Sequence, residues 1–161
     1  MLFWFAGSSF LAVWLVFRDP SFDHRLVMVG ALAPDVVDAP WGAPRVAHTF
    51  LAGVAVLTIV MLATRGRRLL RRRLLVVPIG MFLHLVFDGM WADTSTFWWP
   101  LGGLSFSGDR LPSLERGLLN VPLELAGLAV LIWAWRRFDL GDAARRSLFL
   151  RTGRLDRGLV D

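Results

Sequence analysis

Four strongly apolar stretches hold most of this chain, and they limit the folds that are open to it. They cover about residues 1–17, 46–64, 74–92 and 117–135. At ~1.5 Å per residue, helices of this length come close to crossing the ~30 Å hydrocarbon core of a membrane. The composition agrees, because apolar residues make up 55% of the chain. We therefore expect an all-α integral membrane protein, with four transmembrane helices forming one domain over residues 1–135.

The uneven distribution of arginine predicts the orientation of these helices. The segment 65–73 holds six arginines and no acid, and the tail 136–161 holds seven arginines against four aspartates. The segments on the other side, including the end of the third stretch, hold five arginines against eight acids. By the positive-inside rule the arginine-rich segments face the cytoplasm. This predicts a bacterial-type cytoplasmic (inner) membrane protein with both termini in the cytoplasm.

The basic tail over residues 136–161 needs no nucleic acid to explain its charge. Its arginines alternate with leucine and phenylalanine, a pattern that favours a surface helix on anionic lipid. A solvated tail that only follows the positive-inside rule is the alternative. We expect an anionic lipid partner here and no nucleic-acid partner.

Residues of about 24–37 need separate treatment, because their apolar core is too short to cross a membrane. We expect a short outer-face or re-entrant helix that dips into the outer leaflet or lies across the bundle, with Pro34 ending or kinking it. Asp23 and His24 come at its start, at the interface with water, where a solvated pair or a helix cap is the default. They are weaker candidates for metal ligands.

Histidines and aspartates beside the apolar stretches are the main candidates for chemistry, since such groups are costly next to lipid. His84 and Asp88 are four residues apart, which puts both on one face of a helix. His48 opens the second stretch, and Asp35 and Asp38 lie at the end of the short segment, all predicted at the outer face. Two histidines with two or three carboxylates suit Zn²⁺, with Mn²⁺ or Mg²⁺ as alternatives. The simpler interpretation is a set of hydrogen-bonded pairs that tie helices together.

Four residues are candidates for direct roles in catalysis. Glu124, in the fourth stretch, and Asp38 could each act as a general base on a metal-bound water. Arg25 and Arg45 are predicted close to the carboxylates, where they could balance charge that develops on a leaving group. They could also do no more than neutralise neighbouring aspartates.

The order of these motifs is similar to that of a known family. Leu32-Ala-Pro34-Asp35-Val-Val-Asp38 comes first, followed by Arg45-Val-Ala-His48-Thr49, His84-Leu-Val-Phe-Asp88 and Trp98-Trp99-Pro100. Over about residues 23–103 the chain resembles the YdjM-like or LexA-binding, inner-membrane-associated metal-dependent hydrolases. The resemblance implies a metal-dependent hydrolase. Two departures, a wider spacing of the two aspartates and a reduced histidine-arginine stretch, favour one metal ion over two.

These observations favour a membrane-embedded metal-dependent hydrolase. Asp35, His48, His84 and Asp88 would ligate the metal, with Asp38 as a ligand or as the group that orients one. A membrane lipid with a phosphate or acyl ester is the expected substrate, because a site at headgroup depth is reached laterally from the bilayer. A non-enzymatic membrane protein, whose polar cluster is structural or binds a partner, is the alternative. Ion or proton transfer is disfavoured, since the inner halves of the second and third stretches hold no ionisable residue.

Overall fold

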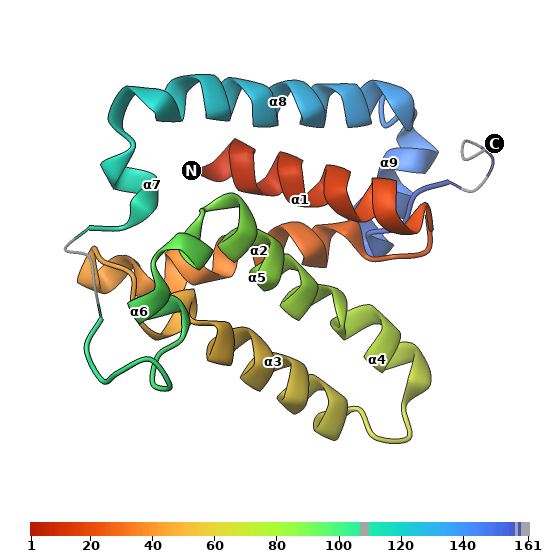
Figure 1. Ribbon diagram of the computed structural model, residues 1–161. Coiled ribbons are helices and arrows are strands. Elements are labelled where there is room, and N and C mark those ends of the chain that lie inside the picture. The colour runs from red at the N-terminus through yellow and green to blue at the C-terminus, as the bar shows by residue number, and fades with distance from the viewer. Residues whose placement is uncertain (107–109, 157, 159–161) are drawn as a thin grey trace.

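The chain is all-helical over the residues that the computed structural model describes, which are 1–106, 110–156 and 158 (Figure 1). Its longer helices are α1 (Leu2–Phe17), α2 (His24–Asp38), α3 (Phe50–Ala63), α4 (Arg68–Leu74), α5 (Val76–Phe87), α8 (Asn120–Arg137) and α9 (Ala143–Thr152). The short helical segments between them are η1 (Ala39–Trp41), η2 (Val46–His48), η3 (Met90–Ala92), α6 (Thr94–Phe97), α7 (Pro112–Glu115) and η4 (Gly117–Leu119). The basic tail comprises the end of α8, then α9 and the segment after it, and its residues 157 and 159–161 lie outside the described part.

Short polar side chains and one glycine set the ends of several helices. Asp23 caps α2, accepting a hydrogen bond from the backbone N–H of Leu26. Thr49 caps α3 in the same way through the N–H of Ala52, 3.0 Å away. Gly89 follows α5 with a φ of +72°, which a residue with a side chain rarely adopts. These local signals make the helices shorter than the apolar stretches that contain them.

Helix α2 packs with one face against α1 and α5 (Figure 1). Val27 and Ala31 are fully buried on it, while α8 packs against α1 and α3 packs against α5. Because α2 runs the length of the bundle, its first and last residues lie at opposite ends. We call these the His24 end, beside α4 and α9, and the Asp38 end, beside η2.

Glycines bring the backbones of neighbouring helices into direct contact. A Cβ atom on Gly80 of α5 would lie 2.2 Å from the carbonyl oxygen of Val27 in α2, and one on Gly30 would lie equally close to a carbonyl of α5. Helices α1 and α8 meet in the same way at Gly7 and Gly127. Only glycine permits such an approach. Packing of α2 on α5 therefore depends on two positions without side chains.

The expectation of four transmembrane helices is wrong. Of the described residues, only Gly117–Arg137 forms a helix long and apolar enough to cross a membrane, and little of it is buried in the bundle. Helices α1 and α3 are apolar but have 16 and 14 residues, and α5 has 12. At ~1.5 Å per residue, α3 is about 21 Å long and α5 about 18 Å, less than the ~30 Å of a hydrocarbon core.

The reason for this error is that apolar composition does not show where a helix begins. The second stretch starts with the turn η2 and the cap Thr49, so α3 begins only at Phe50. The third stretch is divided among the end of α4, α5 and η3. The short helix expected over about 24–37 is α2, which packs against α1 and α5.

The segment before α2 lies next to the arginine-rich segment 65–73, although the sequence placed the two on opposite faces. Asp23 pairs with Arg73 at 3.0 Å, and Asp19 pairs with Arg72 at 2.5 Å. That prediction is wrong for these residues because α2 carries the chain from one end of the bundle to the other. Met1 lies at the Asp38 end, whereas α9 lies at the His24 end (Figure 1).

Replacing Gly80 with alanine tests the contact between α2 and α5. In an unobstructed helix this change stabilises by about 1 kcal/mol, but here the added methyl group meets the Val27 carbonyl. We expect the free energy of unfolding to fall by about 1–3 kcal/mol, measured by denaturant unfolding. Gly141→Ala is the control, because the nearest atom to its added Cβ is 4.0 Å away. Unchanged stability of the Gly80 variant would contradict the packing.

Candidate metal centre

His84 lies in the last turn of α5, and its imidazole is fully buried. Its Nδ1 is 2.7 Å from the carbonyl oxygen of Ala31 in α2. A carbonyl oxygen can only accept, so Nδ1 carries the proton and donates it, which leaves a lone pair on Nε2 of the neutral ring. Phe5 of α1 packs on the ring with 4.1 Å between centroids. The orientation of His84 is therefore set by two other helices.

His48, in η2, is oriented by Asp38 at the end of α2. Its Nδ1 is 2.8 Å from Asp38 Oδ2, which also accepts a hydrogen bond from the backbone N–H of Arg45 at 2.7 Å. The N–H of Ala47 donates to Oδ1 of the same carboxylate at 3.4 Å. Asp38 is thus the acceptor, and the Nε2 of His48 points to the other groups of the site. A carboxylate behind a histidine is the usual arrangement that orients a metal ligand.

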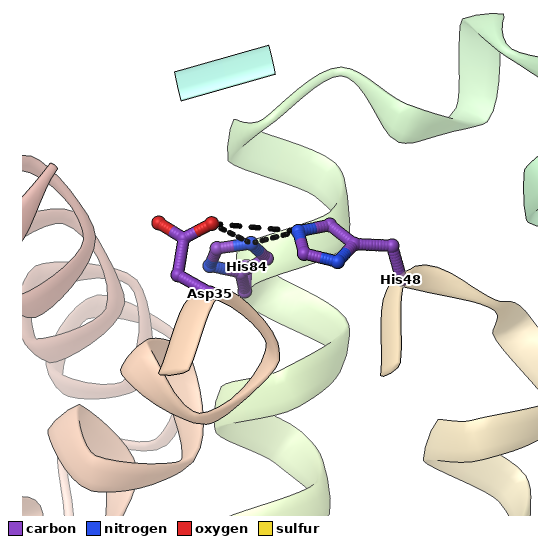
Figure 2. Close-up of side chains that lie close together, drawn as sticks. All are labelled: Asp35, His48 and His84. Atoms are coloured by element: carbon purple, nitrogen blue, oxygen red, sulfur yellow. Dashed lines mark hydrogen bonds and ion pairs between the residues drawn. The ribbon is translucent and has the colours of Figure 1, made fainter. Parts of the chain in front are cut away.

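The two Nε2 atoms and one oxygen of Asp35 face one another (Figure 2). The two Nε2 atoms are 3.3 Å apart. Oδ1 of Asp35 lies 3.4 Å from the Nε2 atom of His48 and 3.8 Å from the Nε2 atom of His84. Ligands at 2.0–2.1 Å from a tetrahedral ion are about 3.3 Å apart, so these separations fit a single ion. The group Asp35, His48 and His84, called the metal centre below, could bind a metal ion.

Asp88 places a second carboxylate next to the metal centre, directly after α5. Its Oδ2 lies 3.9 Å from the Nε2 atoms of both histidines. The side chain is buried, and neither of its oxygens accepts a hydrogen bond within the described part of the chain. Oδ1 faces the guanidinium of Arg116 at 3.0 Å. Asp88 is therefore close enough to ligate an ion or to exchange a proton with a bound water.

Burial and neighbouring charges shift the pKa values of these groups in different directions. Burial opposes the charge on His48, but hydrogen bonds to Asp35 and Asp38 outweigh it and raise the pKa of His48 to about 9. Burial lowers the pKa of His84 to about 4, and the charge on His48 acts in the same direction. Burial raises the pKa of Asp88 to about 6, against the attraction of a nearby guanidinium. A proton on His48 and a metal ion are therefore competitors for the same Nε2 atom.

Five of the residues selected from the sequence come together at the Asp38 end of the bundle. They are Asp35, Asp38, His48, His84 and Asp88. They come from the end of α2, from η2 and from the end of α5, so the predicted convergence of distant segments occurs.

Two of the expected catalytic residues have other contacts. The carboxylate of Glu124 accepts a hydrogen bond from the backbone N–H of Phe3 at 2.7 Å. It therefore binds a free N–H group in the first turn of α1. Arg45 supports the metal centre only through its backbone N–H, which holds Asp38. Its guanidinium lies over the ring of Phe106, 5.5 Å from the centroid.

Arg25, Asp23 and His24 lie at the opposite end of α2 from the metal centre. Arg25 pairs with Asp23 at 3.1 Å, and the ring of His24 packs between Phe10 and Trp14. Ten residues of helix, about 15 Å, separate Arg25 from Asp35. These three residues are therefore not part of the metal centre.

Sequence reasoning missed two positive groups at the metal centre. Arg116 pairs with the carboxylate of Asp88 and also donates a hydrogen bond to its backbone carbonyl. The amino group of Met1 lies 3.7 Å from Asp35 Oδ2. Arg116 comes directly before the fourth apolar stretch. The start of that stretch was predicted at the same face as the metal ligands, and this was the one signal that could have identified Arg116.

Comparison with known proteins adds no further constraint to this geometry. No family model, curated protein or solved structure matches the chain. The resemblance to the YdjM-like proteins therefore stays a prediction, and the function is argued from the site itself.

Substitutions at the metal centre should separate a ligand from the residue that orients it. We expect His84→Ala to abolish stoichiometric metal binding, because it removes one of three ligand atoms. Asp38→Asn keeps all three and should weaken binding by about 10–100-fold, measured by metal titration of the purified protein. His24→Gln is the control, since it removes an imidazole at the other end of the bundle. Full metal binding by His84→Ala would contradict the site.

The raised pKa of His48 predicts that the stability of chelator-treated protein depends on pH. The pKa in the unfolded chain is about 6.5, so the folded protein holds the proton more tightly. The resulting stabilisation is complete below pH ~6.5 and is lost as the pH rises through about 9. We expect the free energy of unfolding to fall by about 1–3 kcal/mol over this range and His48→Asn to lack this dependence. A stability that increases with pH here would contradict the assignment.

Proposed function

We propose that this chain is a metal-dependent hydrolase that acts on the phosphate or acyl ester of a lipid. The observation that carries the proposal is the pair of Nε2 atoms 3.3 Å apart, each turned inward by a donor bond from its own Nδ1. Once His48 gives up its Nε2 proton, two lone pairs face each other in a buried site, and this arrangement favours a cation between them. The carboxylate of Asp35 completes a set of three ligands.

Zinc is the metal that we favour, with Mn²⁺ or Mg²⁺ as alternatives. Two imidazole nitrogens and one carboxylate form a common ligand set of catalytic zinc sites, in which a fourth position stays open to water. A zinc ion in this position would lower the pKa of such a water toward ~7 and supply the nucleophile for hydrolysis. Access would be from the side of Asp35, whose side chain is 17% exposed while those of both histidines are fully buried.

The surrounding residues offer the other functions that hydrolysis needs. Asp88, with a pKa raised to about 6 by burial, can take a proton from the attacking water. Arg116, 3.0 Å from that carboxylate, can stabilise negative charge on the transition state. Asp38 orients His48, and with its oxygens occupied by three donors it is not the base.

A lipid is the substrate that we favour, because an apolar surface adjoins the metal centre. Helix α8 starts at the Asp38 end, where the amide of Asn120 donates to the carbonyl of Ser113 and the Ser113 hydroxyl lies 3.5 Å from Asp35. Around this start Leu118, Leu119, Val121 and Leu125 are each more than half exposed. Gly117–Arg137 also has the length and apolarity to cross a membrane. We therefore propose an enzyme seated in a bacterial-type inner membrane, with the ester of the lipid presented laterally to the metal centre.

The alternative function is a structural metal site in a protein without catalytic activity. The position of Asp88 favours it, because Oδ2 lies equally far, 3.9 Å, from both histidine nitrogens. A small shift would make it the fourth ligand, and four protein ligands with no open position are typical of structural zinc.

Asp88→Asn distinguishes the two functions. In a hydrolase in which Asp88 is the base, the variant should keep its metal while turnover falls by about 10²–10⁴-fold. Turnover is measured as release of inorganic phosphate from phosphatidic acid and of fatty acid from an acyl ester, with zinc present. Glu124→Gln is the matched control, because it neutralises a carboxylate that bonds to α1 and lies outside the metal centre.

A structural site predicts a different combination of results. Asp88→Asn would then lose metal and unfold at a lower temperature, and the wild type would hydrolyse neither substrate. Metal-loaded wild type without turnover would overturn the hydrolase proposal. Turnover that survives both chelation and His84→Ala would overturn it as well.

A further inference from the structure

A second polar site lies at the His24 end of the bundle, away from the metal centre. A hollow of about 240 Å³ opens there between α4, the end of α9 and the segment before α2. It is lined by Arg72, Arg73, Arg151 and Arg154, with Asp23 as its acidic group. At ~30 Å³ per water molecule, the hollow has room for about eight waters, enough for a phosphate group.

Backbone contacts hold the walls of this hollow together. The N–H of His24 donates to the carbonyl of Gly153 at 2.9 Å, and the N–H of Leu155 donates to the carbonyl of Pro20 at 2.9 Å. Gly153 has a φ of +71°, and a Cβ atom on it would collide with the Asp23 side chain. The end of α9 is thereby fixed against the start of α2.

The charges in the hollow are only partly compensated. Asp23 is neutralised by Arg73, at 3.0 Å, and by Arg25, at 3.1 Å. Arg72 is engaged by an aspartate outside the hollow, Asp19, at 2.5 Å.

Two of the lining arginines have no such partner. Within the described residues, the guanidinium groups of Arg151 and Arg154 make no hydrogen bond or ion pair. Two free cations therefore border a hollow whose own acid is already paired.

We propose that this hollow binds a phosphate group, carried by an anionic lipid headgroup or by a soluble phosphate compound. Guanidinium groups match phosphate oxygens through paired N–H donors, and several arginines around one hollow suit a group with three or more acceptor oxygens. The hydroxyl of Ser21, which lines the hollow, offers a further polar contact. The proposal does not depend on the function of the metal centre, because the two sites lie at opposite ends of α2.

The test compares two double variants of equal charge. Arg151→Gln/Arg154→Gln removes the free arginines of the hollow, and Arg67→Gln/Arg68→Gln removes two arginines from the same end of the bundle but outside it. Calorimetric titrations use pyrophosphate, short-chain phosphatidic acid and short-chain phosphatidylcholine. All proteins carry His84→Ala and are treated with chelator, so that phosphate cannot bind at the metal centre. Unfolding temperatures identify any variant that is not folded.

We expect the hollow variant to bind phosphatidic acid at least about tenfold more weakly than its parent, and the control variant to lose less than about twofold. Binding of pyrophosphate with the same dependence would identify any phosphate compound as the ligand, whereas binding of phosphatidic acid alone would identify a lipid headgroup. Equal losses in the two variants would show diffuse attraction to a basic surface and overturn the site. Binding of neither phosphate probe by the folded parent would overturn it too.

Discussion

The hydrogen bond from His84 to the carbonyl of Ala31 connects the packing of this bundle to its chemistry. It forms because Gly30 and Gly80 let α2 and α5 approach until backbone meets backbone. That approach brings the end of α5, with its imidazole, against the end of α2, with its two aspartates. The same bond fixes which ring nitrogen carries the proton, and so leaves Nε2 free to face His48. A small residue in a helix interface therefore determines a ligand geometry one turn away.

The charge balance at the Asp38 end follows from this geometry. Three carboxylates, those of Asp35, Asp38 and Asp88, lie within one buried region and would repel one another without cations. Arg116 and a proton on His48 supply part of the compensation. A divalent ion between the two Nε2 atoms would supply it more directly, since it replaces the proton and draws Asp35 and Asp88 to the same point.

Sequence reasoning selected the residues of the metal centre but predicted the wrong lengths for the helices that carry them. His84 and Asp88 could be selected because the spacing of four residues acts locally, within any helix that forms there. The prediction of four long spans was wrong because helix ends depend on single residues, such as Thr49 and Gly89. Apolar composition does not show the effect of such residues. Arg116 was missed because the contact of its side chain with Asp88 joins segments 28 residues apart, and nothing in the sequence sets that distance.

The misplacement of Arg25 has a different cause, and it explains how one helix can serve two sites. Arg25 was predicted at the metal site because it is close to Asp35 in the sequence. A helix rises ~1.5 Å per residue, so the ten residues between them correspond to about 15 Å. The aspartates at the end of α2 lie beside the two histidines, whereas Asp23 at its start pairs with Arg73 of α4. The backbone N–H of His24 connects the start of α2 to the end of α9. Since one face of α2 is buried along its length, it holds the two ends at a fixed separation. One end of α2 thus carries groups that could bind a cation, and the other lies beside the arginines for which we propose an anion.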